Sequence, residues 1–249
     1  MLGATRRINV YKPPDYEEAA NGKVPVLYMP DGGIAEDFLH VAGLVRVSVG
    51  NGTMRPFLLV GIENTERRRD LTPPTSSDED KKIAPRVGGS AKFRSFIRDE
   101  LMPEIRKRYR TTDEAVIVGE SLAGLFVVET FLLEPKLFDT YIAFDPSLWW
   151  NDQKLVDDAA KLMAEQPKQH RTPYVASSSE EMIPGVAARF HTILKSNKSK
   201  NLDWTYSAIS EETHATIYHP AALKAFRAVF RPKPEAGGAH GGMVDFRPR

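Results

Sequence analysis

The sequence contains no cysteine among its 249 residues. Without a thiol, the chain forms no disulfide, builds no thiolate zinc site and offers no cysteine nucleophile. A chain without cysteine is compatible with either redox compartment, so this absence does not decide where the protein works. Its chemistry must rest on other side chains.

A large net charge is also missing, because 34 basic and 33 acidic side chains nearly cancel. Binding to nucleic acid or to anionic membranes needs a broad basic surface, so we expect no nucleic-acid partner. We find no apolar run of transmembrane length and no signal peptide at Met1, which predicts a soluble chain without a membrane span. The default location is cytoplasmic. It becomes periplasmic or secreted if the N-terminus has been trimmed, and the oligomeric state stays open.

Short apolar runs alternate with helical patterns along the chain, in a sequence that is 41% hydrophobic. This alternation predicts an α/β fold with a mostly parallel central sheet and helices on both faces. We expect one domain over residues 1–232, since a single core of this size is ordinary. The expected strands are 6–11, 24–29, 55–62, 115–119, 140–144, 172–178 and 202–209. The expected helices are 35–47, 92–109, 122–133, 153–165, 186–195 and 221–230.

Two segments depart from this alternation. Residues 63–90 are polar, punctuated by proline and without periodicity, and loops of this length are usually functional or disordered. The loop follows a strand that ends at the edge where ligands bind in such sheets, so we expect it to roof a site. Residues 233–249 are rich in Gly, Pro and charge, which predicts a flexible tail.

The stretch "AVIVGESLAGLFVVETFL" combines a strand pattern, a Gly-Glu-Ser turn and a helix that is apolar on nearly every side. A buried helix that begins directly after a central strand is typical of a nucleophile elbow. Such a turn needs small residues two positions before and after the serine, and Gly119 and Ala123 meet this need. The pattern predicts Ser121 as a nucleophile, although serine also often caps a helix.

A serine hydroxyl needs a base, which a carboxylate then orients. His214 lies in the segment between the last expected strand and the last expected helix, where the base belongs in this architecture. For the acid we favour Glu180 in the loop after strand 172–178. Asp145 at the end of strand 140–144 and Glu181 are the alternatives, as is a Ser-His dyad without a carboxylate.

The oxyanion of an acyl transfer needs backbone donors. The N–H of Leu122 follows the serine at the start of a helix and is the first expected donor. The loop after "VLYMPDGG" supplies the second, with Gly33 preferred over Gly32, because glycine lets the backbone approach a ligand closely.

Two further groups of residues are expected to bind substrate. Arg67 and Arg69, ahead of Arg68, lie in the long loop and suit an anionic or catecholate group, because guanidinium forks match planar acceptors. Trp149 and Trp150 follow strand 140–144, where one of two adjacent tryptophans is expected to line a pocket rather than only pack in the core.

Several stretches together resemble the putative-esterase family of α/β hydrolases, which includes esterase D-like carboxylesterases and ferric-siderophore esterases. They are "VLYMPDGG", "VGIENTERRRDLTPP", "FRSFIRDELMPEIRKRYRT", "IVGESLAGLFVVETFLLEPKLFDTYIAFDPSLWWN" and "EETHAT", and they cover most of the chain from about residue 24 to 219. The resemblance implies an α/β-hydrolase fold, Ser121 as nucleophile, His214 as base and no metal. Relatives commonly carry His and two glycines around the serine, where this chain has Glu120, Ala123 and Gly124.

The sequence thus predicts a serine carboxylic-ester hydrolase that needs no cofactor and acts on a small-molecule ester of small, aryl or siderophore type. An acyltransferase with the same triad is the first alternative. A non-catalytic binding protein of the same fold is the second.

Overall fold

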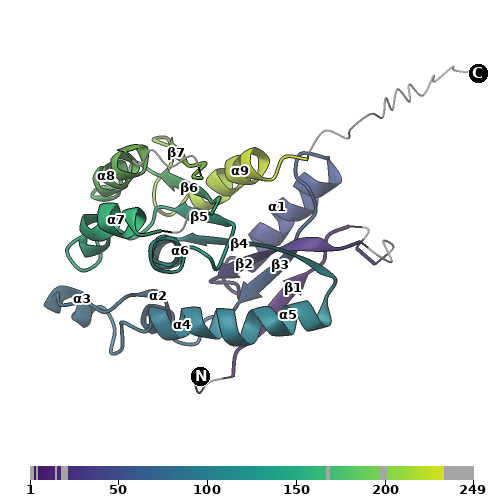
Figure 1. The fold of residues 1–249 in the computed structure, drawn as a ribbon, viewed down its shortest axis with the longest axis horizontal. Coiled ribbons are helices and arrows are strands. Elements are labelled where there is room, and N and C mark those ends of the chain that lie inside the picture. The colour runs from purple at the N-terminus through teal and green to yellow at the C-terminus, as the bar shows by residue number, and fades with distance from the viewer. Residues whose placement is uncertain are drawn as a thin grey trace, which may run out of the picture.

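The structure is a computed structural model that describes residues 3, 5–14, 16–17, 22–166, 169–196 and 201–232. Within these residues, one seven-stranded sheet has the strand order β1-β3-β2-β4-β5-β6-β7 (Figure 1). β1 pairs antiparallel with β3, and all other neighbours pair in parallel. The strands are β1 (Ile8–Tyr11), β2 (Val24–Pro30), β3 (Leu58–Ile62), β4 (Thr111–Glu120), β5 (Thr140–Phe144), β6 (Thr172–Ser177) and β7 (Thr205–Ala208).

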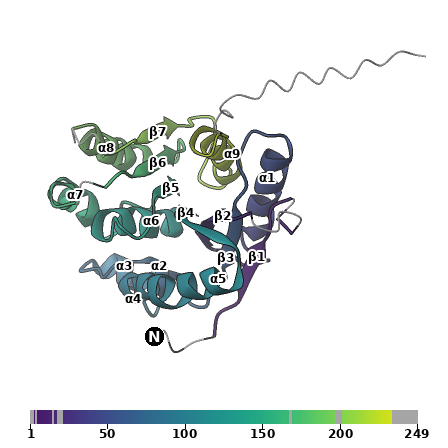
Figure 2. The ribbon, with the colours of Figure 1, turned by 45° about the vertical axis from the view of Figure 1, so that its right-hand side comes forward.

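Helices cover both faces of the sheet, as Figures 1 and 2 show. α1 (Phe38–Gly50) and α9 (Tyr218–Val229) pack on one face. The other face is covered by α4 (Ser90–Phe96), the single π-helical turn η1 (Ile97–Leu101), α5 (Met102–Arg108), α6 (Ser121–Leu133), α7 (Lys154–Ala164) and α8 (Ile183–Ser196).

The strand β2 illustrates why the sheet needs both layers. Its side chains alternate, so that Val26 and Tyr28 enter one core and Leu27 and Met29 the other. All seven residues of β2 are buried, and only a sheet covered on both faces buries a strand completely. The expected α/β class with a mostly parallel sheet is confirmed.

Helix α6 lies against the middle of the sheet and is buried along almost its whole length. Its one buried acid, Glu129, forms an ion pair of 3.0 Å with Arg94 of α4 and accepts a hydrogen bond of 3.0 Å from Ser90 Oγ. A buried charge is tolerated only when it is paired in this way. These contacts hold α6, which follows β4 directly, against α4.

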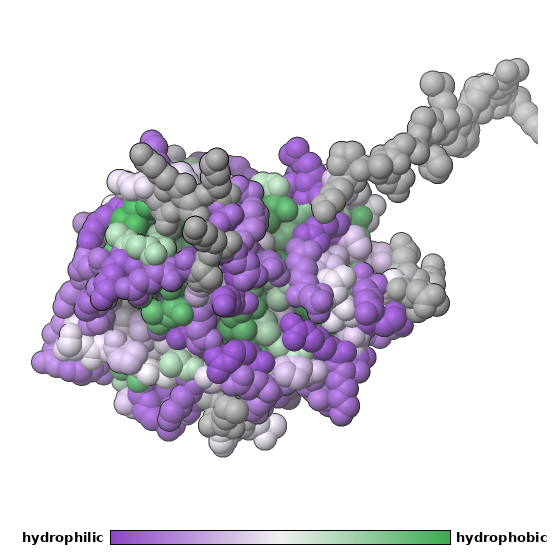
Figure 3. Space-filling view, viewed as in Figure 1, coloured by the Kyte–Doolittle hydropathy of each residue, from purple (hydrophilic) through white to green (hydrophobic). Residues whose placement is uncertain are grey.

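The segment 63–90, expected to be one long loop, contains two five-residue helices, α2 (Arg67–Leu71) and α3 (Asp78–Lys82). Helix formation in α3 is explained locally, because Ser77 Oγ accepts from the Asp80 N–H and acids occupy the first turn. The expected tail 233–249 lies outside the described residues. On the face shown in Figure 3, hydrophilic residues predominate and apolar residues form small separate areas.

Candidate active site

The connection from β4 to α6 has the geometry of a sharp strand-to-helix turn. Ser121 has a φ of 58°, in the left-handed region that is costly for a side chain other than glycine. A Cβ on Gly119 would lie 2.7 Å from the Cβ of Ala123, so the two positions can carry only very small residues. Gly124 is less constrained, because its Cβ would lie 3.0 Å from Pro146 Cα. The turn therefore accepts Ala123 but requires glycine at 119.

Three residues from separate parts of the chain form one hydrogen-bonded series. His214 Nε2 lies 3.1 Å from Ser121 Oγ, and His214 Nδ1 lies 3.1 Å from Asp145 Oδ2. Ser121 follows β4, Asp145 follows β5, and His214 lies between β7 and α9. Parallel strands end at the same edge of the sheet, which brings these residues together although they are up to 93 positions apart.

Asp145 is the carboxylate that contacts His214, whereas the sequence favoured Glu180. Asp145 is fully buried with a φ of 40°, and both of its oxygens accept a hydrogen bond from Ser178, 2.6 Å each from the N–H and the Oγ. These bonds fix the carboxyl group of Asp145 in the direction of the imidazole.

Glu180 and Glu181 are exposed, and no hydrogen bond from His214 to either is found among the described residues. The Glu180 N–H donates to Ser178 Oγ at 3.1 Å. The preference for Glu180 is therefore not supported by the geometry, and the alternative Asp145 holds the position.

The pKa of His214 is raised above its ordinary value, chiefly by the hydrogen bond to Asp145. Burial opposes this increase, while the negative charges of Glu120, Asp145 and Glu180 add to it. An imidazole that is stabilised in its charged form is a stronger base, as a general base must be.

Glu120 is a second acid beside this histidine, with its Oε1 3.3 Å from His214 Nδ1. Burial raises the pKa of Glu120 to about 8, although the charges of His214 and Arg67 oppose the shift. The sequence could have indicated this second acid, because Glu120 directly precedes Ser121.

The backbone N–H groups that we expect to bind the oxyanion differ in whether another group of the protein already accepts a hydrogen bond from them. Leu122 lies in the first turn of α6, where backbone N–H groups have no partner within the helix. The Gly33 N–H donates to Glu36 Oε2 at 2.7 Å, and the Gly32 N–H donates to the Ile62 carbonyl at 3.0 Å. Both glycine amides are thus engaged within the protein, which the sequence did not indicate.

The arginines expected to bind substrate are also paired within the protein. Arg67 Nε and Nη2 donate to the two oxygens of Asp31, at 2.8 and 2.7 Å. Arg69 contacts Asp70 at 2.6 Å and Glu66 at 2.5 Å. Both guanidinium groups are therefore paired with carboxylates, although Arg69 Nη2 is buried without a hydrogen-bond partner.

The two tryptophans have different surroundings. Trp150 is 2% exposed, and its Nε1 donates to the Pro73 carbonyl at 3.0 Å, so it anchors the segment that follows α2. Asn151 Oδ1 holds the same segment by accepting from the Ser76 N–H at 2.9 Å. Trp149 is only partly buried, which leaves it as the one of the pair with surface to offer a ligand.

Among the described residues, no group of three or more His, Cys, Asp or Glu side chains could hold a metal ion. Within the same residues, no helix has the length and apolar character that crossing a membrane requires.

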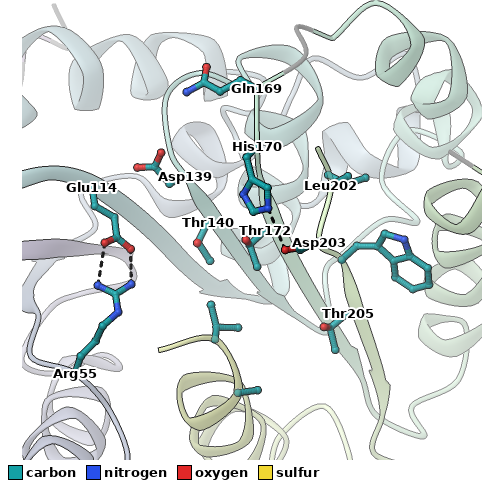
Figure 4. Close-up of a pocket in the computed structure, with 13 residues that line it drawn as sticks. Arg55, Glu114, Asp139, Thr140, Gln169, His170, Thr172, Leu202, Asp203 and Thr205 are labelled. Carbon is teal, nitrogen blue, oxygen red and sulfur yellow. Dashed lines mark hydrogen bonds and ion pairs between the residues drawn. The ribbon is translucent and has the colours of Figure 1, made fainter. Parts of the chain in front are cut away.

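A separate cavity of about 750 Å³ opens at the other edge of the sheet (Figure 4). It is lined by Thr140, Thr172 and Thr205, which begin β5, β6 and β7, whereas the Ser121 site lies where the strands end. A His170–Asp203 contact of 3.0 Å lies in its wall. The cavity is therefore not part of the candidate active site.

Comparison with known proteins agrees with this architecture. Ferri-bacillibactin esterase BesA of Bacillus subtilis (strain 168) is 38% identical over 113 residues, which are 43% of this chain and 37% of that protein. Siderophore triacetylfusarinine C esterase of Aspergillus fumigatus is 28% identical over 171 residues, or 62% of this chain and 54% of that protein. The matched parts thus span only about a third to a half of these relatives.

Among solved structures, an IroE-like serine hydrolase from Shewanella oneidensis covers 90% of this chain and 75% of its own, with 28% identity and a TM-score of 0.78. The BES protein from Bacillus cereus covers 91% of both chains at 24% identity and a TM-score of 0.77, which shows the shared fold. The sheet, its helices and the turn at Ser121 thus define an α/β-hydrolase fold. The chain belongs to the Putative esterase family, whose model matches residues 1–228.

Proposed function

We propose that the protein is a serine carboxylic-ester hydrolase whose triad is Ser121, His214 and Asp145. The observation that carries the proposal is the continuous series of hydrogen bonds through both nitrogens of His214, with distances of 3.1 Å on each side. The family membership and the names of the relatives support the same reaction class.

The proposed reaction proceeds through an acyl-enzyme. Ser121 Oγ attacks the ester carbonyl while His214 Nε2 takes its proton, and His214 then returns that proton to the leaving alcohol. Water then attacks the carbonyl of the acyl-enzyme while His214 takes a proton from it, and His214 returns that proton to Ser121 Oγ as the acid product leaves. The charged Asp145 stabilises the imidazolium that forms in each step.

Charge on the tetrahedral intermediate needs backbone donors. The Leu122 N–H is the proposed first donor. Gly33 serves as the second only after its N–H leaves the Glu36 carboxylate, so we propose that substrate binding displaces Glu36. The 2.7 Å bond between them supports this order of events, since a bound carboxylate and an oxyanion compete for one N–H.

The proposed substrate is a siderophore-type ester, because the relatives are named for esters of that kind. Trp149, the partly exposed one of the two tryptophans, is the proposed aromatic contact. Arg67 and Arg69 are not proposed as clamps, because Asp31, Asp70 and Glu66 already bind them.

A fluorophosphonate probe tests the nucleophile directly. We expect labelling of Ser121 in the folded protein and none in Ser121→Ala. Absence of labelling in the wild type would contradict the hydrolase proposal and favour a binding protein.

A panel of ester substrates tests the proposed substrate class, and product analysis tests the type of reaction. Rates on p-nitrophenyl esters, aryl esters and a siderophore trilactone should be highest on the trilactone. If the fluorophosphonate labels Ser121 but the protein does not hydrolyse the trilactone, only the proposed substrate class is contradicted. Product analysis with an added alcohol acceptor separates hydrolysis from acyl transfer, since a transferase yields mainly the new ester.

A further inference from the structure

Two carboxyl groups, rather than one, face the same nitrogen of His214. Asp145 Oδ2 lies 3.1 Å and Glu120 Oε1 3.3 Å from His214 Nδ1. The sheet dictates this convergence, because Glu120 ends β4 opposite Phe144 of β5, and Asp145 is the next residue. The proposed triad needs only Asp145, so the second carboxyl has no role in it.

The two acids have opposite surroundings. Asp145 is fully buried and accepts two hydrogen bonds from Ser178 in addition to the imidazole contact. The Glu120 side chain is 15% exposed, and among the described residues its carboxyl has one ion-pair partner within 4 Å, His214. Asp145 is therefore held by Ser178 as well as by the histidine, whereas His214 is the ion-pair partner of Glu120 among the described residues.

Charged groups from several elements act on Glu120. His214 and Arg67 favour its ionised form, while Asp31 and Asp145 disfavour it, and burial is the largest influence, raising its pKa to about 8. Arg67 acts on Glu120 although it is also paired with Asp31. The Tyr218 phenol on α9, Asp37 and Glu180 are further titratable groups that act on Glu120, Arg67 or His214. Burial thus favours the protonated form of Glu120 up to a higher pH than for an ordinary glutamate.

We propose that Glu120 is a positioning residue that acts through His214, as a second acceptor at Nδ1 beside Asp145. In its neutral form it keeps an acceptor oxygen beside the Nδ1–H and limits rotation of the ring. In its ionised form it adds a negative charge that stabilises the imidazolium. The proposal rests on the proposed function, in which His214 is the base.

NMR titration of the His214 ring in the full chain tests the coupling without requiring activity. We expect two coupled steps in the wild type, because two interacting groups titrate as a pair. Glu120→Gln should leave one step. Glu211→Gln, which removes an exposed acid of the same loop as His214, should keep both. Identical curves for wild type and Glu120→Gln would overturn the proposal.

Kinetics supply the second measurement. Between pH 6 and 10, kcat/KM of the wild type should gain an alkaline rise of about three- to tenfold as Glu120 ionises, since a close opposite charge shifts a histidine pKa by about one unit or more. Glu120→Gln should lack this rise, and Glu211→Gln should keep it. Glu120→Met, also uncharged, should repeat the result of Glu120→Gln and serves if that variant does not fold.

The two proposals fail separately. Without fluorophosphonate labelling of Ser121, the proposed function is contradicted, while the NMR curves still decide whether Glu120 and His214 titrate together. Normal labelling combined with an unchanged pH profile in Glu120→Gln would overturn the positioning role alone.

Discussion

The two edges of the sheet each carry a histidine in contact with an aspartate, at almost the same distance. His214 and Asp145 are 3.1 Å apart where the strands end, and His170 and Asp203 are 3.0 Å apart where they begin. The exposed fractions differ greatly, because the Asp145 side chain is 0% exposed and that of Asp203 is 74% exposed. Of these two histidines, only His214 has a serine hydroxyl at its other nitrogen among the described residues. Hydrogen-bond length alone therefore does not distinguish a candidate base from a surface pair; burial and a third group do.

The largest expected effect comes from removing each histidine in turn. His214→Ala should lower kcat/KM on an ester by about 10⁴-fold or more, because the serine loses its base. His170→Ala should change it by less than about twofold, since an exposed pair contributes little. Steady-state rates on one p-nitrophenyl ester measure both. Comparable losses in the two variants would show that the edges are not functionally different.

Replacing the two aspartates is the next step of the same comparison. Asp145→Asn should lower kcat by about 10² to 10⁴-fold, because the imidazole loses the charge that orients it. The loss should approach the lower value if Glu120 takes over at Nδ1, and the double variant with Glu120→Gln should then fall further. Asp203→Asn should leave kcat within about twofold.

Glu180→Gln decides between the acids that the sequence offered. Because Glu180 is exposed and makes no hydrogen bond to His214 among the described contacts, we expect kcat to fall by less than about fivefold. A loss larger than that of Asp145→Asn would restore Glu180 as the acid.

The sequence predicted the parts of the molecule that depend on local patterns. Alternation in stretches such as 24–29 reflects a strand buried on both faces, and the predicted sheet follows from it. The proximity of Ser121 and His214 was predicted in the same way, since a strand, a tight turn and a buried helix adjoin in sequence, and the histidine follows the last strand. Their catalytic roles remain proposals.

The sequence did not determine which partner each charged residue contacts. Asp145 and Glu180 both follow strands that end at the same edge, and only the bonds from Ser178 and the left-handed backbone at Asp145 select one of them. Arg67 looked free because its partner, Asp31, is 36 positions away. These pairings depend on which side chains are buried together in three dimensions, and no periodic pattern in the sequence reveals that.

Glu120→Gln should also change stability, by an amount that depends on pH. The pKa of Glu120 is about 8 in the folded protein and 4.5 for the ordinary side chain. Between these values the folded state holds a proton that the unfolded state has released, so stability falls as pH rises through this range. Glutamine does not titrate. The free energy of unfolding of the variant, relative to that of the wild type, should therefore rise by about 2 to 4 kcal/mol between pH 5 and pH 9.

Urea unfolding at pH 5, 7 and 9 measures this gain. Glu114→Gln at the other edge is the matched change, because Glu114 is paired with Arg55 and partly exposed. Glu114→Gln should lower the free energy of unfolding by up to about 1 kcal/mol, and it should show no comparable gain in stability at high pH. A pH-independent difference between Glu120→Gln and the wild type would mean that Glu120 is ionised in the folded protein throughout.

The smallest expected difference concerns two arginine–carboxylate pairs, one near each edge of the sheet. Arg67 donates to both oxygens of Asp31, and Arg55 donates to both oxygens of Glu114. The Asp31 side chain is 6% exposed and that of Glu114 is 34% exposed. Arg67→Met leaves a buried acid without its cation and should cost about 2 kcal/mol, whereas Arg55→Met should cost less than about 1 kcal/mol. Urea unfolding at pH 7 checks both, and equal costs would mean that water compensates Asp31 as fully as it does Glu114.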